Sequence, residues 1–162
     1  MKLHVVVVGP VKGPLSQVVL EYEARAGRYW KLDVVEVEAG SRGRAEPRQV
    51  RAAEEERILA RIPEGSRLLA LSREGDPIDS LGLARYLEGQ ALHAAEGVAF
   101  AIGGAFGLGP GVLARAARRI SLSALTFPHE LARLVLAEQL YRAGTILRGE
   151  PYHKGAEKGG GF

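Results

Sequence analysis

The chain alternates five short apolar runs with five stretches whose apolar residues recur at helical spacing, and this alternation restricts the fold more than any other feature. The run "KLHVVVVG" at residues 2–9 is rich in valine and closes on glycine, which is typical of a strand covered on both faces. Strands are expected at residues 2–9, 30–40, 66–72, 97–104 and 120–125, and helices at residues 16–28, 45–62, 79–95, 109–119 and 128–147. This order predicts an α/β fold with a mostly parallel sheet and helices on both faces.

The length and composition fit one compact unit. At 162 residues, without a repeat or an interdomain linker, residues 1–162 are expected to form a single domain. The glycine-rich end at 155–162 is expected to be flexible. The chain has no cysteine, so it forms neither a disulfide nor a cysteine metal site. No apolar run reaches the ~18 residues of a membrane span, and the first residues lead directly into a strand, so we expect a cytoplasmic protein.

The charge of the chain allows an anionic partner without requiring one. The formal net charge is +3, which is only mildly basic. The clearest basic concentration is Arg42, Arg44, Arg48 and Arg51. These arginines either meet a nucleic acid or belong to a solvated helix face that Glu54 to Glu56 balance.

Two stretches approach known site signatures but fail in their spacing. The loop "GGAFGLG" at 103–109 lacks the third glycine of a dinucleotide fingerprint and the Gly-Lys-Ser/Thr of a P-loop. It is therefore either a tight turn or a place where a ligand approaches the backbone. The stretch "HELAR" at 129–133 has Arg133 where a zinc-binding helix needs its second histidine, so no metal site is predicted.

The expected last helix, 128–147, has apolar residues on more than one face. A surface helix needs only one apolar face, so this helix must be buried on two sides. The sheet can cover one side, and either a second subunit or a loop of the same chain can cover the other.

Three segments together resemble a known family. They are "AIGGAFGLG" at 101–109, "SLSALTFPHELARLVLAEQLYRA" at 121–143 and "RGEPYHK" at 148–154. The combination is similar to the small SPOUT-class methyltransferases that modify large-subunit ribosomal RNA, and among them to the pseudouridine N3-methyltransferases of the RlmH family. The resemblance spans nearly the whole chain.

The resemblance implies a fold and an activity that the patterns alone do not give. It implies a deep trefoil knot in the C-terminal part of the chain, a homodimer, and S-adenosylmethionine bound in the knot. It also implies methyl transfer to N3 of a pseudouridine in 23S ribosomal RNA, in helix 69 of the assembled ribosome. The helix at 128–147 would then lie between the sheet and the partner subunit.

The implied cofactor site joins the ends of three expected strands, at the edge where α/β folds bind ligands. Its residues are Leu71, Gly103, Gly104, Leu122, Ser123, Ala124, Leu125, Thr126 and Phe127. Because the N3 proton of pseudouridine must leave, the candidates for catalysis or substrate orientation are His129, Glu138, Arg142, Tyr152 and His153. The candidates for RNA phosphate contacts are Arg133 and Lys154. An alternative is a non-catalytic module that binds a nucleotide or RNA on the same fold.

Overall fold

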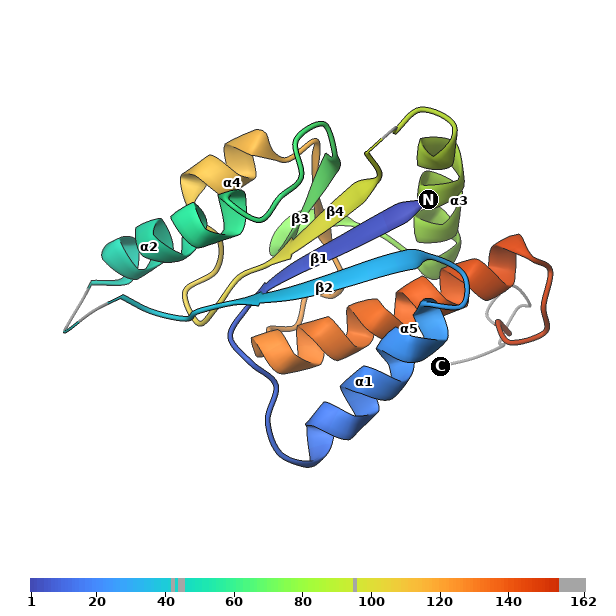
Figure 1. The fold of residues 1–162 in the computed structure, drawn as a ribbon, viewed down its shortest axis with the longest axis horizontal. Coiled ribbons are helices and arrows are strands. Elements are labelled where there is room, and N and C mark those ends of the chain that lie inside the picture. Colours follow the sequence, from blue (N-terminus) through green and yellow to red (C-terminus); the bar gives the residue numbers. More distant parts are fainter. Residues whose placement is uncertain (42, 44–45, 95, 155–162) are drawn as a thin grey trace.

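The computed structural model describes residues 1–41, 43, 46–94 and 96–154, so the end expected to be flexible, 155–162, lies outside the described residues. Figure 1 shows the elements: β1 (Lys2–Val8), α1 (Pro14–Ala26), β2 (Lys31–Val37), α2 (Pro47–Leu59), β3 (Arg67–Pro77), α3 (Ser80–Ala91), β4 (Val98–Ile102), α4 (Pro110–Arg115), β5 (Arg118–Ser121) and α5 (His129–Leu147). Strands and helices alternate as predicted. Asp79 caps α3, because its carboxylate accepts a hydrogen bond from the amide of Gly82 (2.7 Å).

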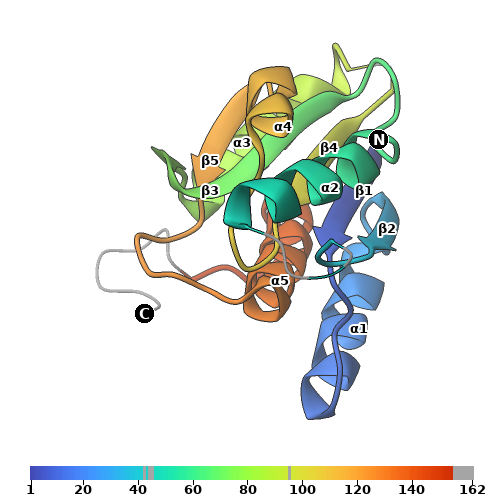
Figure 2. The ribbon, with the colours of Figure 1, turned by 90° about the vertical axis from the view of Figure 1, so that its left-hand side faces the viewer.

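The five strands form one sheet in the order β2-β1-β4-β3-β5, and every neighbouring pair is parallel. Helices α1, α3 and α5 lie on one face of the sheet, and α2 and α4 lie on the other (Figures 1 and 2). The predicted α/β architecture is therefore confirmed. None of the helices in the described residues is long and apolar enough to cross a membrane.

Strand β1 shows why an unbroken apolar run suits this position. Leu3, Val5 and Val7 pack into the core under α1, α3 and α5. Val6 and Val8 pack into the second core, under α2 and α4. Because alternate side chains of a strand point to opposite faces, a central strand with helices on both sides needs apolar residues at odd and even positions alike.

The boundary between α4 and β5 differs from the prediction. Helix α4 ends at Arg115 rather than at residue 119, and β5 spans Arg118–Ser121 rather than 120–125. The amide of Ala117 donates to the carbonyl of Leu68 (2.8 Å), so the chain already runs beside β3 at that point. Pairing with β3 outweighs the local helical pattern, and it leaves residues 122–127 as an irregular segment.

Strand β3 also extends beyond its predicted end. It runs to Pro77 with an irregularity, since Leu71 and Asp76 both pair with Ile120 of β5 and residues 72–75 fall outside this register. A Cβ on Gly75 would lie 2.7 Å from the carbonyl carbon of Arg119, so only glycine allows this close approach. Leu71, which we had expected at the end of this strand, therefore lies within β3.

Helix α5 lies between α1 and α3 on the sheet (Figure 1). The indole of Trp30 donates to the carbonyl of Leu140 (2.8 Å), and Leu136 and Leu140 are fully buried. Neighbours in the same chain thus account for much of its two-sided apolar pattern. Leu131, in contrast, keeps 40% of its surface exposed. The homodimer and the trefoil knot stay predictions.

Candidate functional site

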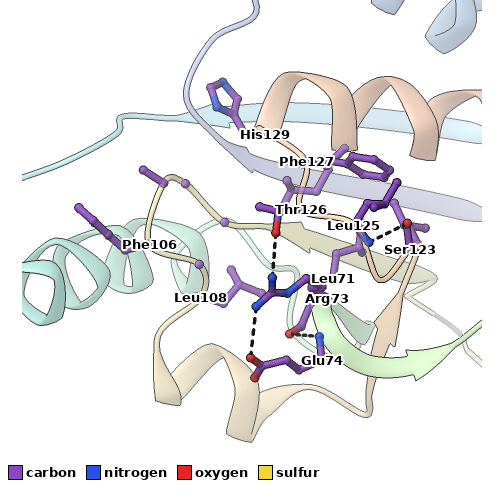
Figure 3. A pocket seen from close by; sticks show the side chains of 18 of the residues that line it. Leu71, Arg73, Glu74, Phe106, Leu108, Ser123, Leu125, Thr126, Phe127 and His129 are labelled. Atoms are coloured by element: carbon purple, nitrogen blue, oxygen red, sulfur yellow. Dashed lines mark hydrogen bonds and ion pairs between the residues drawn. The ribbon is translucent and has the colours of Figure 1, made fainter.

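A cavity of about 470 Å³ opens at the carboxyl edge of the sheet, beside the start of α5 (Figure 3). Three segments surround it: the irregular part of β3, the loop after β4 and the loop after β5. The amino ends and carboxyl ends of parallel strands gather at opposite edges, so loops far apart in the chain meet here. The fold therefore concentrates three chain segments around one opening.

Eight of the nine residues predicted to bind the cofactor line this cavity. They are Leu71, Gly103, Gly104, Leu122, Ser123, Leu125, Thr126 and Phe127. Ala124 belongs to the same loop but is not among the lining residues. The lining is mainly apolar side chains and glycine backbone, so polar contacts with a ligand would fall largely to backbone groups.

The glycine loop after β4 is both a tight turn and a wall of the cavity. The amide of Gly107 donates to the carbonyl of Gly104 (3.0 Å), and Gly107 has a φ of 77°, which disfavours any residue with a side chain. A Cβ on Gly103 would lie 2.7 Å from the carbonyl carbon of Gly107. The tight turn is therefore observed, and it brings backbone to the edge of the cavity; contact of this backbone with a ligand stays a prediction.

Two glutamates of α2 lie beside this loop, with the carboxylate of Glu54 close to Gly104 and that of Glu55 close to Gly109. The carboxylate of Glu55 accepts hydrogen bonds from the amides of Gly111 and Val112 (3.1 Å for Val112), at the start of α4. Glu54 is buried, and its carboxylate accepts a hydrogen bond from the amide of Gly40 (2.8 Å). These two residues therefore do not form the solvated face that we considered as one explanation of the basic concentration.

His129 begins α5 and lines the cavity. Its Nε2 lies 2.9 Å from the carbonyl oxygen of Pro10, so Nε2 carries a hydrogen and donates it. Figure 3 shows the ring directed away from Arg73, toward the segment that follows β1. In the neutral ring, Nδ1 is then the nitrogen that can accept a proton.

Four of the predicted catalytic or orienting residues form a second group, which we call the tail cluster: Glu138, Arg142, Tyr152 and His153. Glu138 Oε1 accepts hydrogen bonds from Arg142 Nη2 (2.7 Å) and from the Tyr152 hydroxyl (3.0 Å). Arg142 Nη1 lies 3.1 Å from His153 Nδ1. Burial, and then the hydrogen bond to Glu138, raise the pKa of Tyr152 from 10.0 to about 12.

The tail cluster does not line the cavity in its own chain. His129 and Arg142 stand at positions 129 and 142 of the same helix, which separates them by about 20 Å at a rise of about 1.5 Å per residue. Sequence reasoning had grouped His129 with the tail cluster as candidates for one site. Within one subunit the structure keeps them apart.

The structure gives the two predicted RNA-binding residues different surroundings. Arg133 is 5% exposed, and its guanidinium donates to both carboxylate oxygens of Glu23 (2.9 and 3.0 Å) and to Glu36 (2.7 Å). A buried and fully paired arginine is not free to contact phosphate, so this arrangement argues against the role predicted for Arg133. Lys154 is exposed at the end of the described chain.

Four charged or aromatic residues of the cavity were not anticipated: Arg51, Arg73, Glu74 and Phe106. Arg51 lies at the cavity because α2 passes behind the glycine loop. Arg73 and Glu74 reach it because β3 is irregular at that point. A glycine close to the end of an expected strand, here Gly75, is a signal for such an irregularity. No three histidine, aspartate or glutamate side chains in the described residues gather in a way that would hold a metal ion.

Comparison with known proteins agrees with the fold. A family profile described as "Predicted SPOUT methyltransferase" matches residues 1–153. The chain belongs to the SPOUT methyltransferase family. Within it, the chain is similar to proteins named ribosomal RNA large subunit methyltransferase H.

Three relatives illustrate the similarity. The protein from Gemmatimonas aurantiaca is 48% identical over 155 residues, which cover 95% of this chain and 100% of the relative. The protein from Listeria monocytogenes is 43% identical over 159 residues, with the same coverage of 95% and 100%. The protein from Bifidobacterium adolescentis is 42% identical over 161 residues, again covering 95% and 100%.

Proposed function

We propose that this protein transfers a methyl group from S-adenosylmethionine to N3 of a pseudouridine in large-subunit ribosomal RNA, in helix 69 of the assembled ribosome. The observation that carries the proposal is that eight predicted cofactor residues surround one cavity in a chain of the SPOUT methyltransferase family. Relatives that align over their whole length and are named for large-subunit ribosomal RNA methylation support the substrate class. Such a substrate would place the protein in the cytoplasm.

The cavity suits the proposed cofactor in size and chemistry. Its volume of about 470 Å³ lies within the range of about 300–1,000 Å³ that is usual for small-molecule sites. The apolar side chains of Leu71, Leu122 and Phe127 would enclose the adenine, and the backbone of the glycine loop would supply hydrogen-bonding groups. Ala124 enters the proposal only as part of the loop that joins these residues.

When bound, S-adenosylmethionine supplies a methyl group already activated by the positive charge of the sulfonium. The residues of the chain then have to hold donor and acceptor in line, which is the main source of rate in such a transfer. They also have to remove the proton of N3. His129 is the candidate within the cavity, and its Nδ1 is the atom available to accept that proton, because Nε2 donates to Pro10.

The tail cluster supplies the other candidates. Tyr152 is a weak candidate for the base, because a pKa of about 12 keeps its hydroxyl protonated near neutral pH. It can instead donate a hydrogen bond or stack on an RNA base. Glu138 and His153 stay candidates for proton transfer or substrate orientation, and Arg142 and Lys154 for phosphate binding.

We propose further that the protein acts as a homodimer in which the tail cluster of one subunit works at the cavity of the other. Two observations support this: His129 and Arg142 are separated by about 20 Å along α5, and none of the tail-cluster residues lines the cavity of its own chain. The exposed Leu131 at the start of α5 provides apolar surface for such an interface.

The test is methyl transfer from labelled S-adenosylmethionine to ribosomes from a strain that lacks the modification, followed by mass mapping of the RNA. We expect one methyl group per ribosome, on a pseudouridine of the large-subunit RNA. Binding of S-adenosylmethionine without transfer to ribosomes, subunits or free RNA would favour the non-catalytic module instead.

A further inference from the structure

The irregular part of β3 carries two charged side chains to the opening of the cavity. Residues 72–75 lie outside the register in which Leu71 and Asp76 both face Ile120. Ser72 Oγ accepts a hydrogen bond from the amide of Glu74 (3.3 Å), which tightens this segment, and Gly75 packs directly on the backbone of β5. Arg73 and Glu74 therefore lie on a short irregular segment of β3 that these two contacts hold in place.

Arg73 extends from this segment to the loop after β5. Its Nη1 donates to the hydroxyl oxygen of Thr126 (2.9 Å), and Figure 3 shows the guanidinium between Thr126 and Glu74. Nη2 lies 3.8 Å from the carboxylate of Glu74, which is too far for a hydrogen bond. In the described part of the chain Arg73 has no further hydrogen-bond acceptor, so most of its five N–H groups are available to a ligand.

The charges at the opening match one end of the proposed cofactor. S-adenosylmethionine and its product S-adenosylhomocysteine both end in an amino acid group, with a carboxylate beside an ammonium. Arg73 and Glu74 present the opposite pair of charges on adjacent residues. The other arginine of the cavity, Arg51, lies on α2 with its Nη1 3.5 Å from the carbonyl oxygen of Phe106.

We propose that Arg73 binds the α-carboxylate of the methionine part of the cofactor and thereby selects complete S-adenosylmethionine over adenosine compounds that lack the amino acid. The planar fork of the guanidinium can bind a carboxylate through two parallel hydrogen bonds, which lysine cannot reproduce. This role rests on the proposed methyltransferase function, but it concerns one subsite within the cavity.

The experiment measures the affinity of two ligands by calorimetry. S-adenosylhomocysteine carries the amino acid group, and 5′-methylthioadenosine has the same adenosine and sulfur without it. Loss of a charge-assisted hydrogen bond predicts that Arg73→Met weakens S-adenosylhomocysteine binding by about 10- to 100-fold. The same substitution should leave 5′-methylthioadenosine binding within about twofold, a change smaller than 1 kcal/mol. Arg73→Lys should show an intermediate loss for S-adenosylhomocysteine alone.

Two further variants separate this role from indirect effects. Arg85→Met makes the same change of charge on the exposed side of α3, away from the lining residues, and should change neither affinity. Thr126→Val removes the hydroxyl that holds Arg73 but keeps the guanidinium, so it should weaken S-adenosylhomocysteine binding less than Arg73→Met does.

The possible results are distinct. An equal loss for both ligands in Arg73→Met would mean that Arg73 shapes the loop rather than binding the carboxylate, and the inference would fail. No change in either affinity would overturn it as well. If the wild-type protein bound neither ligand, the proposed function itself would fall together with the inference.

Discussion

Mixing two inactive variants tests whether the tail cluster acts on the cavity of the partner subunit. The first variant, Gly103→Val, damages the cavity, since its Cβ would lie 2.7 Å from the backbone of Gly107. The second is truncated after Glu150, which removes Tyr152, His153 and Lys154. Glu150 itself stays bound, because its carboxylate accepts from the Tyr29 hydroxyl (2.5 Å) and its amide donates to the carbonyl of Thr145 (2.9 Å).

The expected size of the effect follows from the separation of the two sites. His129 and Arg142 are about 20 Å apart along one helix, and no tail-cluster residue lines the cavity of its own subunit, so we expect the cavity and the tail that act on one methyl group to come from different subunits. In an equal mixture of exchangeable subunits, about half of the dimers contain one copy of each variant. Each such dimer has one intact cavity facing one intact tail, so about a quarter of the wild-type activity should return.

The assay is initial-rate methyl transfer to unmodified ribosomes, with S-adenosylmethionine near the wild-type KM and with the two chains co-expressed under different tags. Each variant expressed alone sets the background, and calorimetry should show that the truncated chain still binds S-adenosylhomocysteine. Activity in the mixture no higher than this background would refute action across the subunits. Near-normal activity of the truncated chain alone would show that the tail takes no part in catalysis.

Three further predictions follow from individual contacts. Arg133→Met should lower the free energy of unfolding by about 3 kcal/mol in urea titrations, because it leaves the nearly buried Glu23 unpaired. Glu36→Gln should lower it by less than about 1 kcal/mol, since the side chain of Glu36 is 43% exposed. Leu131→Asp should give folded monomers in light scattering, because Leu131 is exposed in the subunit. Leu140→Asp should misfold instead, because Leu140 is fully buried and the new charge would have no partner. If Leu131→Asp stayed dimeric, this face would not belong to the interface. In an ultraviolet difference titration against Tyr152→Phe, the phenol of Tyr152 should stay un-ionised until about pH 12. Burial and the bond to Glu138 raise its pKa above 10.0, so the stability it contributes is complete below pH 10 and is lost as the pH rises through about 12; ionisation of Tyr152 near pH 10 would contradict this buried, hydrogen-bonded position.

The main lines of the fold were predictable because they depend on local patterns. The valine run of β1 indicated a strand covered on both faces, and the structure divides its side chains between two cores. Asp79 was expected at the start of a helix and does cap α3. Segments 101–109 and 121–143 carry the family resemblance, and eight of the nine cofactor residues that this resemblance implied line the cavity.

The boundaries and partners that were missed all depend on contacts between distant parts of the chain. Arg118 and Arg119 continue a helical pattern in sequence, yet pairing with β3 makes them part of a strand. Arg133 looked like a candidate for RNA because its partner Glu23 is 110 positions away in the sequence. No residue near Arg133 in the sequence indicates that Glu23 is its partner.

The sequence by itself determined the order of strands and helices, the family, and which loops follow the carboxyl ends of the strands. Periodicity and chain connectivity are enough for the elements and the loops, since both are properties of neighbouring residues. The family follows instead from the resemblance of segments 101–109, 121–143 and 148–154. Only the tertiary structure decided that Arg73 donates a hydrogen bond to Thr126 and that Arg133 is bound in an internal ion pair with Glu23. It also decided that the residues of the tail cluster bind one another and do not line the cavity. A side chain's availability depends on what packs against it, and packing brings together residues whose separation along the chain carries no signal.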